Sequence, residues 1–293
     1  MYHNRSPRIV PSAAVPPTAG GPRPLVERPN PALDTRVARD EQQRKAATTI
    51  TPATPQGSPE ARRPPITLVC VSDTHGLYAE PGLLKVPAGD MILFPGDVEV
   101  GTAAEGAAFS RWLEGLPVRG PRVLTWGNMD TGTPGQKDLV PAATVVVDAI
   151  VEVNGYRIFA SPWTPRFAGA YQLDQDEEGL FARWSALLPP DSDVDIILTH
   201  GPPHGIADGA RGRHRGDPGL LRAVQALRKP PLLWVCGHIH EQYGLHRVPH
   251  PAAPGGSFPL LNSAVYYARK PEHAATAQPR ALRLPQVELL PLE

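Results

Sequence analysis

Aspartate, asparagine and histidine residues stand at the C-terminal ends of five short apolar segments of the chain. The five clusters are Asp73-Thr74-His75, Gly96-Asp97, Gly127-Asn128, His200-Gly201 and Gly237-His238-Ile239-His240. Each cluster alone is typical of a turn or of a hydrogen-bonded core histidine. Ligands of open α/β sheets, however, bind beyond the carboxyl ends of the strands. The ordered set of five clusters therefore predicts that these side chains converge on one site.

These side chains suit borderline divalent ions such as Mn²⁺, Zn²⁺, Fe²⁺ or Ni²⁺, because they supply carboxylate oxygen and imidazole nitrogen. The seven candidate ligands are Asp73, His75, Asp97, Asn128, His200, His238 and His240. Seven ligands are more than one tetrahedral ion needs, but they suffice for two ions about 3.5–4 Å apart that share a carboxylate. Such a pair activates water and clamps phosphoryl oxygens. Since no P-loop, Gly-x-Ser-x-Gly or dinucleotide-binding motif competes, the predicted chemistry is phosphoester hydrolysis.

The segments that must position these clusters alternate between strand and helix patterns. Apolar, β-branched runs predict strands over residues 66–72, 91–94, 122–126, 144–153, 156–160, 195–199, 232–236, 258–261 and 287–290. Helical spacing predicts helices over residues 103–116, 177–188 and 219–229. Asn154-Gly155 predicts a tight hairpin turn. This pattern favours an α/β fold with mixed sheets.

Residues 1–63 differ in composition from the rest of the chain. They hold ten basic and five acidic residues, many of the 37 prolines and few large apolar groups. We therefore expect a disordered, basic, proline-rich tail, followed by a single domain over residues 64–293. A mitochondrial transit peptide is the alternative, because no acidic residue precedes Glu27. The early prolines, however, break any amphipathic helix there.

Composition also limits the class of protein. The 29 basic and 29 acidic residues cancel, so stable nucleic-acid binding is not expected. There is no apolar run of about 18 residues and no apolar leader, which predicts no membrane span and a cytoplasmic localisation. Cys70 and Cys236 are expected to be buried thiols. The expected partner is a small phosphoester substrate, and the oligomeric state is left open.

The five clusters resemble the signature of the calcineurin-like metallophosphoesterase superfamily, which runs Asp-x-His, Gly-Asp, Gly-Asn-His-Asp/Glu, His and Gly-His-x-His. The resemblance covers most of residues 66–265. Its metallophosphoesterase domain-containing (MPPED-like) branch is indicated by the segments VSDTHG (71–76), SPWTPRF (161–167), LTHGPPHGIAD (198–208), CGHIHEQYG (236–244) and LNSAV (261–265). The fold that this resemblance implies is a four-layer αββα sandwich of two mixed β-sheets flanked by helices.

The resemblance also implies roles for the seven ligands. Asp73, His75 and His240 would bind the first of two divalent ions, and Asp97 would bridge to the second. Asn128, His200 and His238 would complete the second site. The implied reaction is attack of a metal-bridging hydroxide on a phosphoester, and in this branch on phosphodiesters of the cyclic-nucleotide type. The identity of the ions, among Mn, Zn, Fe and Ni, stays open.

One position departs from the family pattern. Met129 stands where the family carries a histidine that protonates the leaving oxygen and is held by the following acid, here Asp130. A thioether cannot donate a proton, so we expect phosphodiesters or activated esters as substrates rather than alkyl monoesters. We hypothesise that His204, four residues after His200, is a substitute catalytic proton donor. The alternative is that His204 is a surface loop histidine. The alternative to an enzyme is a catalytically weak or inactive metal-binding scaffold for protein partners.

Several other side chains near the predicted site have two open interpretations. Trp163 either stacks on a nucleobase or packs in the wall, and Arg166 either meets a substrate phosphate or lies on the surface. Arg211, Arg213 and Arg215 form a small basic loop that either rims an anionic substrate or is solvated.

Overall fold

The computed structural model describes residues 63–131 and 135–291, all of which lie in one unit, Gln56–Glu293. The predicted tail, residues 1–63, lies outside the described residues except for Arg63. That side chain is buried and forms an ion pair with Asp195 of the domain. No helix among the described residues is long and apolar enough to cross a membrane.

The first six-stranded sheet carries three of the five polar clusters. Its strand order is β16-β15-β1-β2-β3-β4. The bounds are β1 Ile66–Cys70, β2 Met91–Phe94, β3 Arg122–Leu124, β4 Thr144–Val145, β15 Arg280–Leu284 and β16 Glu288–Leu289. Strands β1 to β4 are parallel, and β15 and β16 form an antiparallel edge. The carboxyl ends of β1, β2 and β3 therefore meet at one edge of the sheet.

The second six-stranded sheet carries the two histidine clusters. Its strand order is β13-β14-β12-β9-β6-β5. The bounds are β5 Ala149–Val153, β6 Tyr156–Ser161, β9 Ile196–Thr199, β12 Leu233–Cys236, β13 Gly244–Pro249 and β14 Ser257–Asn262. The four central strands are parallel. The predicted hairpin joins β5 to β6, and Asn154 (φ 50°) and Gly155 (φ 76°) both take the left-handed backbone of a type I′ turn.

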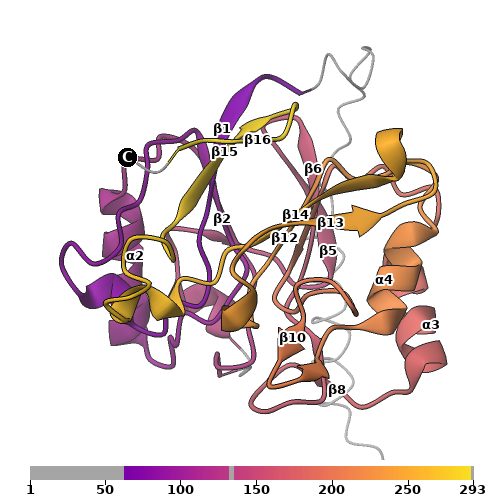
Figure 1. Ribbon diagram of the computed structural model, residues 1–293. Helices are drawn as coiled ribbons and strands as arrows, with labels where there is room; N and C mark the ends of the chain where they lie inside the picture. The colour runs from indigo at the N-terminus through magenta and orange to yellow at the C-terminus, as the bar shows by residue number, and fades with distance from the viewer. Residues whose placement is uncertain (1–62, 132–134, 292–293) are drawn as a thin grey trace, which may run out of the picture. The chain divides into compact units, whose positions relative to one another are not determined.

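Helices cover the outer face of each sheet, which gives four layers (Figure 1). Helix α2 (Ala103–Gly115) packs on the first sheet, and α3 (Glu177–Leu187) and α4 (Pro218–Gln225) pack on the second. Side chains alternate accordingly along β1. Leu68 lies in the core between the sheets, whereas Val69 lies in the core beneath α2. The expected four-layer αββα sandwich of two mixed β-sheets is thus confirmed.

The prediction of one strand over residues 144–153 is wrong. The segment forms two strands in different sheets, β4 in the first and β5 in the second. Between them Asp148 adopts a left-handed backbone with φ 52°, which interrupts an extended strand. Its carboxylate accepts hydrogen bonds from Ser161 Oγ and Trp163 Nε1. These contacts hold the crossing from one sheet to the other.

The strands β13 and β15 were not predicted. Both contain arginine and lie near sheet edges, so their hydrophobic alternation is weak. Two short ribbons, β7 Thr164–Pro165 with β8 Gln172–Leu173 and β10 Gly209–Ala210 with β11 Arg213–His214, extend from the second half of the chain. The described 3₁₀ turns are η1 Leu77–Ala79, η2 Gln136–Leu139, η3 His240–Gln242, η4 Pro254–Gly256 and η5 Tyr266–Arg269.

The two helices on the second sheet begin at aspartate caps that differ in burial, and this difference gives a matched stability test. Asp176 caps α3 through Gly179 N at 2.9 Å and is exposed. Asp217 caps α4 through Leu220 N at 2.8 Å, is buried, and also accepts the indole N–H of Trp184 at 2.8 Å.

We predict that Asp176→Ala lowers the free energy of unfolding by about 1 kcal/mol, the usual effect of losing a cap. Asp217→Ala is expected to cost about 2–4 kcal/mol, because it also leaves a buried indole N–H unpaired. Urea unfolding of both variants measures the difference. Equal losses would contradict the role assigned to the bond from Trp184.

Candidate metal centre

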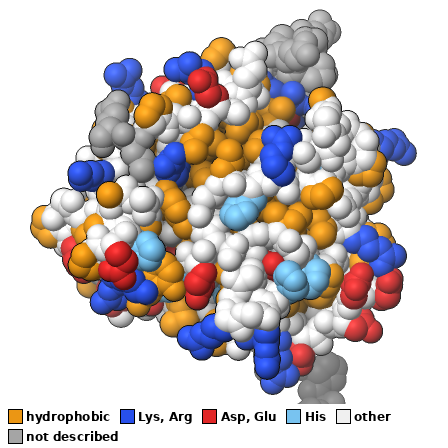
Figure 2. All heavy atoms as spheres, in the orientation of Figure 1, with side chains coloured by type: hydrophobic (Ala, Val, Ile, Leu, Met, Phe, Trp, Pro, Cys, Tyr) orange, Lys and Arg blue, Asp and Glu red, His pale blue; other side chains and the backbone are white. Residues whose placement is uncertain are grey.

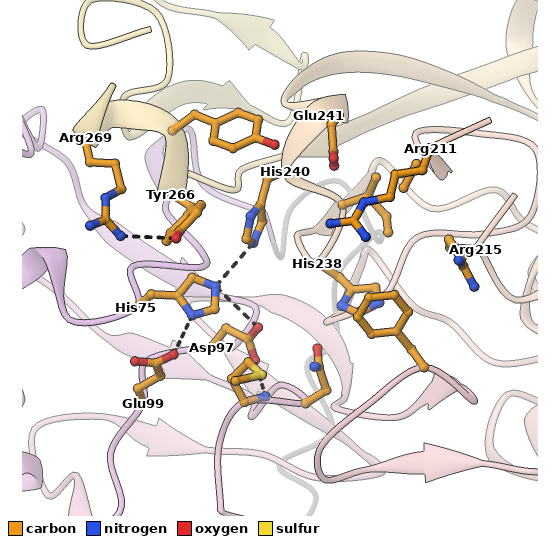
Figure 3. A pocket seen from close by; sticks show the side chains of 16 residues that line it. His75, Asp97, Glu99, Arg211, Arg215, His238, His240, Glu241, Tyr266 and Arg269 are labelled. Carbon is orange, nitrogen blue, oxygen red and sulfur yellow. Dashed lines mark hydrogen bonds and ion pairs between the residues drawn. The ribbon is translucent and has the colours of Figure 1, made fainter. Parts of the chain in front are cut away.

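The predicted ligands lie together where the carboxyl ends of the parallel strands of the two sheets meet. His75, Asp97, Asn128, His238 and His240 line a cavity of about 490 Å³, whose lining side chains are drawn in Figure 3. The two remaining predicted ligands, Asp73 and His200, are fully buried and contact this group. The structure thus brings all seven predicted side chains to one place.

Hydrogen bonds join the two sheets at this edge. Ser72, which follows β1, donates its N–H to the carbonyl of Ser263 at 3.0 Å and accepts the N–H of Val265 at 2.9 Å. Ser263 and Val265 follow β14 of the other sheet. The Nδ1 atom of His200 lies 2.9 Å from the carbonyl oxygen of Pro95 in the loop after β2. The spacing between the clusters is therefore fixed by backbone contacts.

Asp73, His75 and His240 form a first group of ligand atoms, all within 4.8 Å of one another. His240 Nε2 lies 3.2 Å from Asp73 Oδ1 and 3.2 Å from His75 Nε2. His75 Nδ1 lies 2.8 Å from the carboxylate of Glu99, which acts as a hydrogen-bond acceptor. In the neutral ring the proton is therefore on Nδ1, and Nε2 presents its lone pair to the group.

Asp73, Asp97 and His200 form a second group. His200 Nδ1 donates to Pro95, so in the neutral ring Nε2 carries a lone pair. That Nε2 lies 2.8 Å from Asn128 Oδ1 and 3.4 Å from Asp97 Oδ1, which are both acceptors. A cation between these atoms would satisfy their lone pairs. The donor set fits a divalent ion.

Asp97, a member of the second group, also approaches the first group. Its Oδ1 faces His200, and its Oδ2 lies 3.6 Å from His75 Nε2. Asp73 belongs to both groups. Two carboxylates therefore connect the candidate ion positions, and the sequence pointed to only one of them.

His238 is placed differently from the other predicted ligands. Its backbone N–H donates to both carboxylate oxygens of Asp73 at 3.0 Å. Its ring lies against that of His200, with ring centres 4.9 Å apart, and against Phe167 at 5.1 Å. The ring thus borders the second group from the cavity side without being one of the three residues that define it.

Burial has opposite effects on the acids and the histidines of the site. Burial, with the charges of Asp73 and Asp130, raises the pKa of Asp97 well above its usual range. Burial acts the same way on Asp73, but the hydrogen bond from His240 and the nearby imidazole charges hold its pKa below the usual value. Burial lowers the pKa of His238 to about 3, so this ring is neutral at pH 7. Neutral imidazole and ionised carboxylate are the forms that bind a metal.

The backbone around the ligands is held in a rarely populated conformation. Asp73 (φ 53°), His75 (φ 43°), Asp97 (φ 55°) and His238 (φ 67°) all lie in the left-handed region. Such conformations cost energy and recur at functional sites, where the surrounding structure enforces them. They turn the side chains back toward the sheet edge.

Two glycines of the motifs are required by close approach. A Cβ on Gly127 would lie 2.2 Å from Asp97 Oδ1, and a Cβ on Gly237 would lie 2.0 Å from Asp73 Oδ2. Neither backbone position has room for a side chain. The glycines that precede Asn128 and His238 therefore let the two buried carboxylates sit directly against the neighbouring loops.

Asp130 has a full set of hydrogen-bond partners without a histidine at position 129. Its carboxylate accepts four backbone N–H groups, from Asp97, Val98, Glu99 and Gly127, at 2.8–3.2 Å. It therefore ties the loop after β2 to the loop after β3. Met129 itself is 49% exposed and lines the cavity, while its backbone N–H donates to Asp97 Oδ1 at 2.8 Å.

The structure does not bring every predicted residue to the cavity. His204 does not line it; its ring lies 4.9 Å from that of His214, and its Nδ1 lies 3.8 Å from Asp208. Trp163 instead donates to Asp148, and Arg166 pairs with an exposed aspartate, Asp174. Among the three loop arginines, Arg211 and Arg215 line the cavity and Arg213 does not.

Sequence reasoning missed Glu99 and the aromatic wall of the cavity. Glu99 follows Gly96-Asp97 after one further residue, and its contact with His75 spans 24 positions, which no local motif indicates. Tyr266 packs on both His75 and His240, with ring centres 4.9 and 4.7 Å apart. It follows the segment 261–265, which was noted only for its resemblance.

Three comparisons show which known proteins this chain is similar to. Residues 66–242 match the family model described as calcineurin-like phosphoesterase. Metallophosphoesterase domain-containing protein 1 of Homo sapiens and that of Mus musculus are each 33% identical over 218 residues, covering 64% of this chain and 64% of the relative. A crystal structure of TT1561 of Thermus thermophilus is similar with a TM-score of 0.44 and 16% identity, covering 68% of this chain and 89% of that chain.

The family match includes all five polar clusters that meet at the sheet edge. It spans most of the described part of the chain and ends just beyond His240. The chain thus belongs to the calcineurin-like phosphoesterase family, and it is similar to proteins of the metallophosphoesterase domain-containing branch.

Proposed function

We propose that the chain is a metal-dependent hydrolase of small phosphodiesters that holds two divalent ions. The observation that carries this proposal is the pair of ligand groups that share Asp73, with Asp97 of the second group close to the first. Buried carboxylates and imidazole nitrogens converge there, and divalent ions would balance the charge of the carboxylates.

Each group has its own ligands for an ion. In the proposal, Asp73, His75 and His240 hold one ion, Asn128, His200 and His238 hold the other, and Asp97 bridges the two. Nitrogen and oxygen donors of this kind favour Mn, Zn, Fe or Ni over softer or harder ions. When bound, two such ions lower the pKa of water and stabilise charge on phosphoryl oxygens.

The chain's own residues then determine which esters react. Met129 has no proton to give to a leaving oxygen, and the predicted substitute, His204, lies outside the cavity lining. Substrates with acidic leaving groups, or diesters whose leaving group is stabilised otherwise, are therefore favoured. The cavity of about 490 Å³ has the size of a small-molecule site.

The second candidate function is a metal-binding scaffold for protein partners, which the exposed Met129 favours. Turnover separates the two candidates. An enzyme hydrolyses bis-p-nitrophenyl phosphate when Mn²⁺ is added, whereas a scaffold binds the ion without turnover.

We predict that Asp97→Ala lowers Mn²⁺-dependent hydrolysis of bis-p-nitrophenyl phosphate by roughly 10³-fold, because ion-based stabilisation of the transition state amounts to several kcal/mol. The matched control is Asp174→Ala, which removes an exposed aspartate that pairs only with the exposed Arg166. Release of p-nitrophenol at saturating Mn²⁺ measures both. Tight metal binding by the unaltered chain with no turnover would instead favour the scaffold.

Met129→His is expected to raise turnover of a diester with an alkyl leaving group about tenfold or more, since it adds a proton donor at the cavity. On bis-p-nitrophenyl phosphate the same variant should change turnover little, because that leaving group needs no proton. Met129→Leu is the size-matched control. If the histidine variant accelerates neither ester, a missing proton donor is not what sets substrate choice.

Glu99→Ala should weaken Mn²⁺ binding roughly 10–100-fold, because the carboxylate fixes the tautomer and orientation of His75. Glu99→Gln keeps a side-chain oxygen as acceptor and is expected to lose less. Isothermal titration calorimetry on the two variants gives both affinities. Identical affinities in Glu99→Ala and the unaltered chain would show that His75 needs no such support.

A further inference from the structure

Three arginines, Arg211, Arg215 and Arg269, line the cavity, and none has an acidic partner within the described part of the chain. Arg269 instead donates a hydrogen bond to the hydroxyl of Tyr266. Arg211 and Arg215 both line the cavity, yet neither takes part in any described ion pair. The cavity lining also holds two exposed carboxylates, Glu99 and Glu241. Glu99 contacts His75, and neither carboxylate forms a described ion pair with Arg211 or Arg215.

The position of these arginines differs from that of the ligand groups. Figure 3 shows Arg211 and Arg215 on the side of the cavity opposite His75 and Glu99. The guanidinium carbon of Arg215 lies over the ring of Phe167, 5.4 Å from its centre. Phe167 in turn contacts His238. An apolar ring therefore separates this guanidinium from the ligand histidines.

The loop that carries both arginines is pre-organised. The buried Asp208 accepts the N–H of Gly205 at 2.9 Å and of Gly216 at 3.1 Å, and its carbonyl accepts the N–H of Arg215 at 3.1 Å. Within the loop, β10 pairs with β11, and Gln242 Nε2 donates to Gly209 O at 3.0 Å. Little ordering is needed when the arginines bind a ligand.

Charge on the surface is consistent with an anion site. Figure 2 shows basic side chains gathered at the lower edge of the face, where Figure 1 places β10. The Nε of Arg215 is buried and has no hydrogen-bond partner in the described structure. Arginine binds phosphate through two parallel hydrogen bonds, and two guanidinium groups match the charge of a terminal phosphate dianion.

We infer that the substrate carries a second, terminal phosphate in addition to the scissile diester, and that Arg211 and Arg215 bind it. This inference rests on the proposed function, because the ligand groups on the opposite side would take the scissile phosphate. The part of the substrate between the two phosphates lies against the exposed apolar side chains of Met129 and Phe167. A nucleoside bisphosphate diester has this arrangement.

The test compares thymidine 5′-(4-nitrophenyl phosphate) with the same diester phosphorylated at the 3′ position, both with Mn²⁺. We expect kcat/KM to be about tenfold or more higher for the phosphorylated diester, as one charge-assisted contact provides. Arg211→Ala and Arg215→Ala should each reduce this ratio, mainly through KM, and the double variant should bring it close to one. Arg213→Ala, on the same ribbon but outside the cavity lining, is the matched control and should keep it.

Each outcome decides. If both diesters are hydrolysed and the ratio of their kcat/KM values is near one, the inference is wrong and the proposed function stands. The same conclusion follows if the ratio is high and stays high in the double variant. If neither diester is hydrolysed, the proposed function fails. The inference is then decided by calorimetric binding of thymidine 3′,5′-bisphosphate against thymidine 5′-phosphate in the Mn²⁺-loaded protein. Equal affinities, or affinities unchanged by the double substitution, overturn it. Thermal unfolding checks each variant, and Arg215→Gln replaces Arg215→Ala if the latter does not fold.

Discussion

Two buried carboxylates set the central constraint of this structure. Asp73 has no exposed surface and Asp97 almost none, and the two lie beside each other at the junction of the sheets. Buried negative charges so close together are unfavourable unless positive charge compensates them. Burial lowers the pKa of His200 and His238, so those rings supply lone pairs rather than charge. A bound cation would supply the compensating charge. The left-handed backbone at both aspartates also costs conformational free energy, and the surrounding structure enforces it.

The sandwich makes this arrangement by bringing together the carboxyl ends of the parallel strands of its two mixed sheets. Ser72 links them directly through backbone hydrogen bonds to the segment after β14. Asp130 adds a second link within the first sheet, because its carboxylate gathers backbone N–H groups from the loops after β2 and β3. Burial raises the pKa of Asp130 to about 6, although those hydrogen bonds oppose the shift. Asp130 thus has a structural role next to the site, and this role does not depend on a histidine at position 129.

The sequence was sufficient for the parts that depend on local order. Polar residues after apolar runs predicted which side chains lie together at the sheet edge, and the Asn154-Gly155 turn predicted the hairpin. It was insufficient where contacts depend on tertiary position. The segment 144–153 looks like one continuous strand, and only the backbone at Asp148 divides it between the sheets. Glu99 reaches His75 across a loop, and no spacing rule links the two. His204 follows a ligand closely in sequence, but the turn stabilised by Asp208 directs it away from the cavity lining.

The proposed metal ligands and the proposed substrate-binding arginines come from separate parts of the chain. The ligands stand at strand ends, where sheet register fixes them, whereas Arg211 and Arg215 stand on a loop between β9 and α4. That loop is closed by its own buried acid, Asp208, and not by any ligand group. Under the proposed function, substitutions in the loop would alter which ester fits without disturbing the ions, whereas substitutions at the strand ends would disturb both. Position 129 can accept a methionine next to the candidate ligands because its side chain projects into the cavity and only its backbone N–H supports Asp97.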